Sequence, residues 1–215
     1  SSDFYALILN TTIVTMVLTP MLAALTAPIY SFFGRWFRPI PLQPLHFPKR
    51  DLKDHLVIAG GGRVGRYVAG ILQRLGTAFL IIEWNSRRVD ELKALGFPVL
   101  YGDAGKEIIL EAAEMGKARL LLITTPVTLI SQVVVAQAKK LNPAIEIIAR
   151  AEGIEEMKGL RDQGVALVVQ PEFEASLEFA RQALLNLHIP VEEIDRYTDE
   201  VRNELYQPLY PPSKE

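Results

Sequence analysis

The sequence predicts an α/β protein with a doubly wound parallel sheet of order 3-2-1-4-5-6, preceded by one membrane-spanning helix. Three observations support this prediction. Residues 4–34 carry no charged side chain, a glycine-rich turn joins a short apolar run to a helical pattern at residues 56–75, and strand-like and helix-like segments then alternate up to about residue 170. The sheet is therefore expected to belong to a soluble domain that follows a membrane segment.

The composition excludes several classes of function. The chain of 215 residues has 23 Lys+Arg against 25 Asp+Glu, a formal charge of -2, which argues against nucleic-acid binding. With no cysteine, disulfides, thiol catalysis and cysteine-ligated metals are excluded. The three histidines, His46, His55 and His188, lack the spacing of metal ligands. We therefore expect neither a metal site nor catalytic residues.

Residues 1–34 are interpreted as a transmembrane helix. The 31 uncharged residues from Phe4 exceed the roughly 20 that span a bilayer core. Polar Asn and Thr residues and two prolines favour packing against other membrane helices, and Arg35 and Arg38 place the following residues on the cytoplasmic side. Because the chain opens with Ser1, we expect a fragment whose segment is the last of several membrane helices. A buried helix of a soluble protein is the alternative.

Residues 35–54 form a proline-rich basic linker. Four prolines between residues 39 and 48 favour an extended, semi-rigid spacer. Lys49, Arg50 and Lys53 place positive charge where anionic headgroups would attract it. A solvated linker with incidental charge explains the same residues equally well.

A G-x-G-x-x-G motif at Gly60, Gly62 and Gly65 follows the predicted strand Leu56–Ala59 and opens a helix. In this Rossmann-like context the glycines allow a tight turn, close approach of a pyrophosphate, and close helix–strand packing. The strand 78–82 leads to Glu83, 18 residues after Gly65, where a carboxylate binds ribose hydroxyls. The alternative is a purely structural turn.

The residues after this acid bear on nucleotide choice. Glu83 favours an unphosphorylated adenosine ribose, whereas nearby Arg87 and Arg88 are able to accept a 2′-phosphate or to stay solvated. Trp84 either covers the adenine or packs against the sheet.

The alternation continues along the chain. We predict strands at 98–101, 119–124, 145–149 and 166–170, and helices at 87–95, 104–115, 128–141 and 154–163. Ligands bind beyond the carboxyl ends of such strands. The residues at those ends are Gly60 to Arg63, Glu83, Gly102, Asp103, Thr124, Thr125 and Arg150.

These motifs together resemble one family. The segment VIAGGGRVGRYVA, Glu83, the turn from Tyr101 to Ala104 and the late Gln170-Pro171-Glu172 resemble the RCK or KTN (TrkA-N) domain of potassium channels and transporters. The preceding TMVLTPML resembles the last membrane helix of the cation:proton antiporter-2 family, which includes Kef-type potassium/proton antiporters. The resemblance assigns residues 55–172 to the nucleotide-binding domain.

The resemblance implies a cleft for NAD(H) or an adenine nucleotide (AMP, ADP or ATP). The implied binding residues are Gly60, Gly61, Gly62, Arg63, Val64, Gly65, Glu83, Trp84, Gly102, Asp103, Ala104, Thr124, Thr125 and Arg150. For Arg150 a surface salt bridge is an equal alternative. In residues 173–215 the resemblance implies a crossover helix at 173–188 that embraces a second subunit, followed by a second helix and a tail. An ordinary packing helix of the same subunit is the alternative.

The function expected is a cytoplasmic regulatory domain of a monovalent cation (K+ or Na+):proton antiporter of a prokaryotic inner membrane. It would act as a dimer, attached to an exchanger core. A potassium-channel regulatory domain and a soluble NAD-dependent oxidoreductase are the alternatives. An oxidoreductase usually needs a second domain that holds the substrate, and these residues leave no room for one. The Tyr-x-x-x-Lys spacing at Tyr210 and Lys214, typical of some oxidoreductases, falls in a proline-containing tail.

Overall fold

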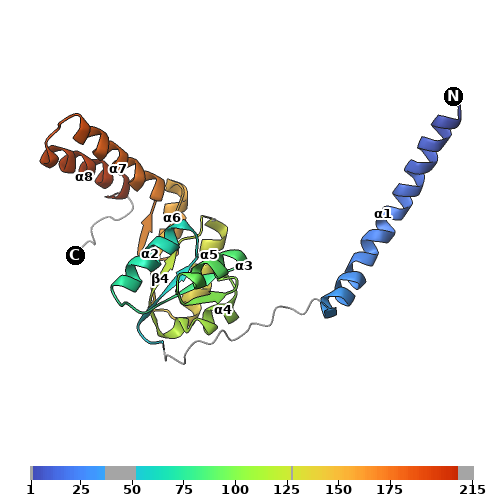
Figure 1. Cartoon of the computed structure of the whole chain (residues 1–215), viewed down its shortest axis with the longest axis horizontal. Helices are drawn as coiled ribbons and strands as arrows, with labels where there is room; N and C mark the ends of the chain where they lie inside the picture. The colour runs from blue at the N-terminus through green and yellow to red at the C-terminus, as the bar shows by residue number, and fades with distance from the viewer. Residues whose placement is uncertain (1, 37–51, 127, 208–215) are drawn as a thin grey trace. The chain divides into compact units, whose positions relative to one another are not determined.

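The computed structural model describes residues 2–36, 52–126 and 128–207. The chain divides into two compact units, Ser1–Leu45 and His46–Glu215 (Figure 1). Most of the predicted linker and the tail from residue 208 lie outside the described residues, so the expectations for them stay predictions.

The first unit contains one long helix, α1 (Ser2–Trp36). Its window Asp3–Pro20 has a mean hydropathy of 1.3, and α1 is the one helix of the described residues that is long and apolar enough to cross a membrane. All side chains of that window are exposed within the unit. The single apolar N-terminal helix predicted from the sequence is thus present.

Four threonines of α1 between residues 11 and 19 satisfy their hydroxyl groups within the helix. Thr11 and Thr12 donate to the carbonyl oxygens of Leu7 and Ile8 at 2.8 Å, and Thr19 donates to that of Thr15 at 2.6 Å. Such i−4 bonds remove the need for an outside partner in an apolar environment. These threonine hydroxyl groups therefore have acceptors inside α1, and packing against other membrane helices stays a prediction.

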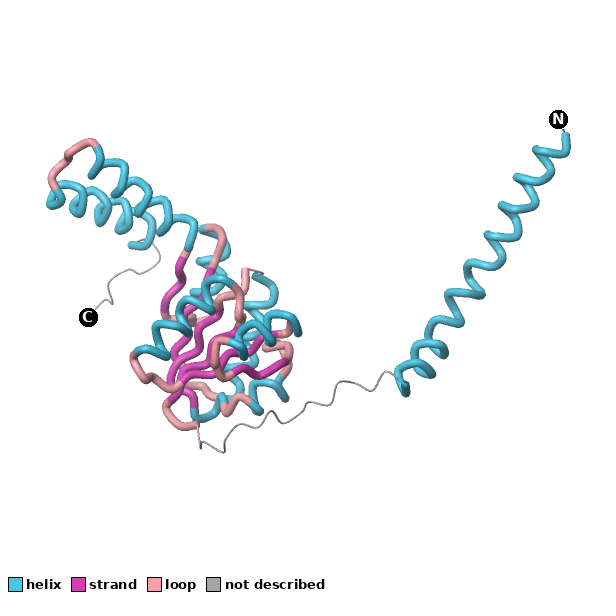
Figure 2. The backbone as a smooth tube through the Cα atoms, viewed as in Figure 1, coloured by secondary structure: helices cyan, strands magenta, loops and turns pink. Residues whose placement is uncertain are grey.

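The second unit is built around six parallel strands in the order β3-β2-β1-β4-β5-β6, which confirms the predicted order (Figure 2). The strands are β1 (His55–Ala59), β2 (Phe79–Glu83), β3 (Val99–Tyr101), β4 (Ala118–Ile123), β5 (Glu146–Arg150) and β6 (Leu167–Val169). The helices are α2 (Arg63–Arg74), α3 (Ser86–Ala94), α4 (Glu107–Ala112), the 3-10 turn η1 (Met115–Lys117), α5 (Thr128–Leu141), α6 (Ile154–Asp162), α7 (Pro171–Asn186) and α8 (Val191–Tyr206).

Two predicted helix boundaries are wrong. The helix expected at 104–115 is only the six-residue α4 followed by η1, because Glu114 takes a left-handed conformation (φ 54°) that interrupts it. The helix expected at 173–188 begins two residues earlier, at Pro171, since proline is favoured at the first helical position.

The two faces of the sheet are covered unequally. Helices α2 and α3 contact strands β1 to β3 on one face, and this core includes Ile58, Ile81 and Leu92. The other face forms the larger core, which draws side chains from β1 to β6 and from the helices that follow β3. On the first face, the apolar side chains over β4 to β6 are not fully covered: Leu167 is exposed, and four more are partly buried, Leu120, Leu122, Ile148 and Val169.

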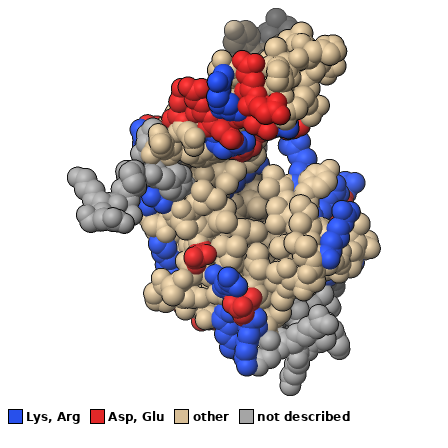
Figure 3. All heavy atoms as spheres, turned by 90° about the vertical axis from the view of Figure 1, so that its left-hand side faces the viewer, with Lys and Arg blue, Asp and Glu red and all other residues tan. Residues whose placement is uncertain are grey.

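Helices α7 and α8 pack against each other as a hairpin. The Phe173 and Tyr206 rings meet edge to face at 5.9 Å, and the Tyr206 hydroxyl accepts a bond from the Gln170 backbone N at 3.3 Å. Acidic side chains gather over this hairpin in Figure 3. Within the hairpin, Glu174 of α7 forms an ion pair with Arg202 of α8 at 3.2 Å, and the hydrogen bond between them raises the pKa of Arg202.

Candidate nucleotide-binding site

The glycine loop joins β1 to α2 at the carboxyl edge of the sheet. Gly60 has φ 113°, a conformation that side chains rarely adopt. A Cβ placed on Gly65 would lie 2.0 Å from the Gly60 carbonyl oxygen, so only glycine lets α2 approach the loop this closely. A Cβ on Gly62, in contrast, would meet no atom within 4 Å. The open backbone at the start of α2 is therefore available to a ligand, as the motif requires.

Glu83, the last residue of β2, holds the glycine loop through a hydrogen bond to its backbone. Its side chain is only 2% exposed, its Oε2 accepts a bond from the Gly61 backbone N at 2.8 Å, and its Oε1 accepts one from the Asn85 backbone N at 2.9 Å. The Arg88 guanidinium lies 3.8 Å from Oε2. The predicted ribose-binding acid is thus also a structural link between two strand ends, a role that its sequence position did not reveal.

An apolar pocket of about 290 Å³ opens beside this loop. Six of the predicted residues line it: Gly60, Trp84, Gly102, Asp103, Ala104 and Thr125. Ile82 and Ile130 complete the lining and were not predicted. Ile130 lies in the first turn of α5, and the expected position of that helix after β4 could have indicated it. The Trp84 side chain is 68% exposed, so it does not pack into the sheet.

Polar side chains at two other strand ends, Thr124 and Asp103, form hydrogen bonds to the backbone of the domain. The Thr124 hydroxyl donates to the Gly60 carbonyl oxygen at 2.7 Å and thereby ties β4 to the glycine loop. The Asp103 Oδ1 accepts a bond from the Gly105 backbone N at 2.8 Å, which shapes the turn after β3. Val64 is half-buried in the first turn of α2.

Arg150 ends β5, as predicted, but its charge is already engaged. Its Nη2 lies 2.7 Å from Glu172 and 3.7 Å from Glu152, while its Nε is buried without a hydrogen-bond partner among the described residues. In the structure Arg150 therefore forms salt bridges, as in the alternative given for it from the sequence.

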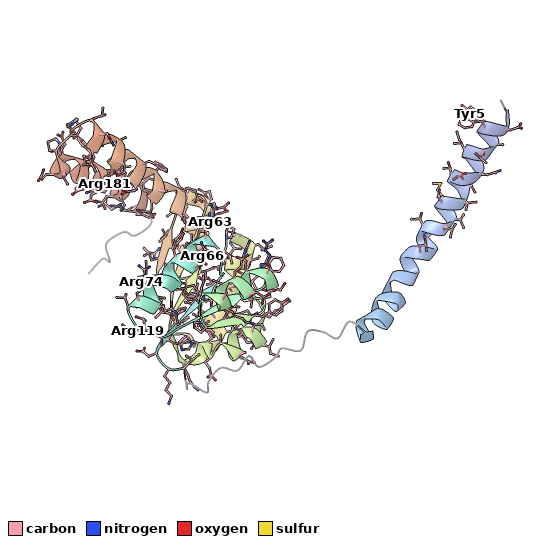
Figure 4. The ribbon with its side chains drawn as sticks, in the orientation of Figure 1. Tyr5, Arg63, Arg66, Arg74, Arg119 and Arg181 are labelled. Carbon is pink, nitrogen blue, oxygen red and sulfur yellow. The ribbon has the colours of Figure 1, made fainter. Side chains whose placement is uncertain are left out.

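A second pocket, of about 140 Å³, lies on the α2–α3 side of the loop. The sequence predicted three of its lining residues, Gly61, Gly62 and Arg63. Arg88 was named from the sequence only as one of two arginines able to accept a 2′-phosphate, and Arg66, Glu91 and Leu92 were not predicted. Figure 4 shows Arg63 and Arg66 at the N-terminal end of α2 and Arg74 toward its other end. Arg66 follows the motif by one residue, so the arginine spacing was a usable signal.

This arrangement offers surfaces that suit the separate parts of a nucleotide. The open helix start at Gly62 suits a diphosphate, Glu83 suits a ribose and the apolar pocket suits a base. In the described parts of the chain, no group of three or more His, Asp or Glu side chains is placed to hold a metal ion.

The chain is similar to curated proteins named as cation antiporters. It is 28% identical to a putative K(+) efflux antiporter KefB of Alkalimonas amylolytica, over 94% of this chain and 31% of that protein. It is 34% identical to the putative cation/proton antiporter YbaL of Escherichia coli, over 65% of this chain and 24% of that protein. The chain thus spans a third or less of the length of these relatives.

Two solved structures share the fold of the second unit. The TrkA-N domain of the inner membrane protein YbaL from Escherichia coli matches with a TM-score of 0.56 and 33% identity, over 64% of this chain and 98% of that one. The AMP-bound C-terminal domain of a Shewanella denitrificans Kef protein matches with a TM-score of 0.65 and 26% identity, over 73% of this chain and 95% of that one.

The family model of the TrkA-N domain matches residues 56–171. This range covers more than half of the chain and contains all six strands from Leu56 onward together with the glycine loop and both pockets. The chain belongs to the TrkA-N domain family.

Proposed function

We propose that this chain joins the last membrane-spanning helix of a monovalent cation (K+ or Na+):proton antiporter to the nucleotide-binding domain that regulates it. The observation that carries the proposal is the apolar pocket beside the open glycine loop, on a fold similar to an AMP-bound Kef domain. The curated relatives favour an antiporter over a channel, because the two described above are named as an efflux antiporter and a cation/proton antiporter.

The ligand is NAD(H) or an adenine nucleotide, AMP, ADP or ATP. The base would enter the pocket between Trp84 and Asp103, the ribose would lie at Glu83, and the phosphates would lie over Gly62. The domain performs no bond-forming step in this proposal. It is a binding module, since hydride transfer needs a placed proton donor and usually a second, substrate-holding domain.

The protein belongs to a prokaryotic inner membrane, with residues from about 35 onward in the cytoplasm. Helix α1 supplies the span, and Arg35 in its last turn and Arg38 just after its end lie where the positive-inside rule places cationic residues. An exchanger core of further membrane helices is its partner within the same protein.

The domain acts as a homodimer through its C-terminal helices. The hairpin exposes large apolar side chains, with Phe179 at 78%, Leu187 at 69% and Tyr197 at 48%. The partly buried sheet face over β4 to β6 is a second apolar surface of the same unit. Exposed apolar surface of this extent is typical of protein–protein contacts.

Nucleotide binding would stabilise one geometry of this dimer, and the linker would pass the change to the membrane helices. The effect on exchange cannot exceed the difference in nucleotide affinity between the two states. Regulation of transport therefore requires a nucleotide whose affinity depends on the dimer geometry.

Thermal melts with a panel of nucleotides test the binding step. For the full chain in detergent, a ligand at 100 times its Kd is expected to add roughly 2.7 kcal/mol of stability. Adenine nucleotides should shift the melt, whereas guanosine monophosphate serves as the control for base recognition. If no adenine nucleotide shifts the melt at millimolar concentration, the proposed site is wrong.

A further inference from the structure

The second pocket differs in chemistry from the apolar one. It lies between the start of α2 and the first turns of α3, and its lining includes Arg63, Arg66 and Arg88. The apolar pocket takes Gly60 and Trp84 from the same segments but no arginine. The apolar pocket therefore suits a nucleotide base, and the arginine-lined pocket suits an anion.

The second pocket carries excess positive charge. Glu91 is its only acidic lining residue, and it already pairs with Arg87 at 3.4 Å. In the described part of the chain, neither Arg63 nor Arg66 pairs with a carboxylate, and the Arg66 guanidinium lies 5.7 Å from the ring centre of Tyr67. Guanidinium groups placed together in this way suit a phosphate, which accepts several charge-assisted bonds.

Glu83 lines neither pocket itself but lies between them, since its chain neighbours Ile82 and Trp84 line the apolar pocket. Its Oε2 is bonded to the Gly61 backbone N, and Gly61 itself lines the arginine pocket. A substituent on the ribose hydroxyl beside Glu83 would therefore lead past Gly61 toward Arg66 and Arg88. Two backbone N–H bonds and the Arg88 guanidinium at 3.8 Å offset the charge of Glu83, which would otherwise repel a phosphate.

We propose that the pocket of Arg63, Arg66 and Arg88 binds a phosphate carried at the 2′ position of the adenosine ribose. This inference rests on the proposed nucleotide site and adds to it a preference for ribose-phosphorylated adenine nucleotides, the class to which NADP(H) belongs. A nearby arginine is the group that accommodates a 2′-phosphate in dinucleotide-binding folds.

Calorimetric titration of the full chain in detergent with AMP and with adenosine 2′,5′-bisphosphate tests the inference. The bisphosphate is expected to bind roughly ten- to a hundredfold more tightly, the effect of hydrogen bonds to charged groups. The variants R66Q and R88Q should each reduce this ratio toward one. R74Q, on the same helix but in its last turn, should leave the ratio unchanged.

The outcomes separate the two proposals. If AMP binds and the bisphosphate binds equally or more weakly, the phosphate subsite is refuted while the nucleotide site stands. If neither nucleotide binds, the nucleotide site itself fails. Inorganic phosphate is the third titrant, and binding as tight as that of the bisphosphate, sensitive to R88Q, would show a free-phosphate site and overturn the ribose assignment.

Discussion

The carboxylate of Glu83 accepts a hydrogen bond from the backbone N of Gly61 at 2.8 Å. This contact joins the end of β2 to the loop after β1 through a side chain that is 2% exposed. The residue expected to recognise a ribose thus also holds the loop on which the phosphates would lie. In the proposed function, this one buried group would couple ligand binding to the order of the loop.

Replacing Glu83 with Ala should lower both stability and nucleotide binding. The change leaves the buried Gly61 N and the Asn85 N without their acceptors, at a cost of about 1–3 kcal/mol. Urea unfolding of the full chain measures the loss. Glu155→Ala is the matched control, since that side chain is 87% exposed in a surface pair with Lys158 and should cost less than about 1 kcal/mol. Equal effects of the two variants would contradict the structural role of Glu83.

Alanine at Gly65 should mainly lower the stability of the domain, whereas alanine at Gly62 should mainly prevent nucleotide binding. Gly65→Ala places a methyl group 2.0 Å from the Gly60 carbonyl oxygen, so α2 must move away at a cost of about 1–3 kcal/mol. Gly62→Ala meets open space and should cost only about 0.5 kcal/mol as a helix cap. It should nevertheless remove the nucleotide-induced melting shift, because the methyl group occupies the path of the phosphates. A Gly62→Ala protein that keeps the full shift would place the phosphates elsewhere.

Phe179→Glu should convert the proposed dimer to a monomer. The side chain is 78% exposed within the subunit, so the substitution should leave the subunit fold intact while placing a charge in the subunit contact. Sedimentation equilibrium of the full chain in detergent measures the mass, and Phe179→Leu, which keeps an apolar side chain, should remain dimeric. A wild-type protein that is monomeric at all concentrations would refute the dimer.

Arg202→Gln should weaken the hairpin slightly, by less than about 1 kcal/mol, because Arg202 and Glu174 are both partly exposed. The hydrogen bond to Glu174 raises the pKa of Arg202, so this contribution is fully present below the ordinary arginine pKa and is lost only above the raised one. The stability difference between wild type and variant should therefore be the same at pH 7 and pH 9 in urea titrations. A difference that falls by half over this range would contradict the assignment.

The sequence predicted the strand order, because right-handed crossovers between alternating elements leave few topologies. It placed the α4 region less well, since the left-handed Glu114 that ends this helical stretch follows from packing rather than from local preference. It indicated the residues of the apolar pocket through the rule that ligands meet the carboxyl ends of strands. Ile130 and Arg66 were not predicted although the expected helix after β4 and the arginine spacing offered signals, because only the packed structure shows which side of each helix faces a pocket.

What the sequence by itself determined is the separation of an apolar N-terminal helix from a charged α/β domain, and the glycine motif with its acid. Those features depend on composition and on spacing along the chain. Only the tertiary structure decided that Glu83 holds the glycine loop, that Arg150 is paired with Glu172, and that three arginines from α2 and α3 line one pocket. The physical reason is that hydrogen bonds and ion pairs between distant segments require a fixed relative position, which forms only when the sheet and its helices pack together.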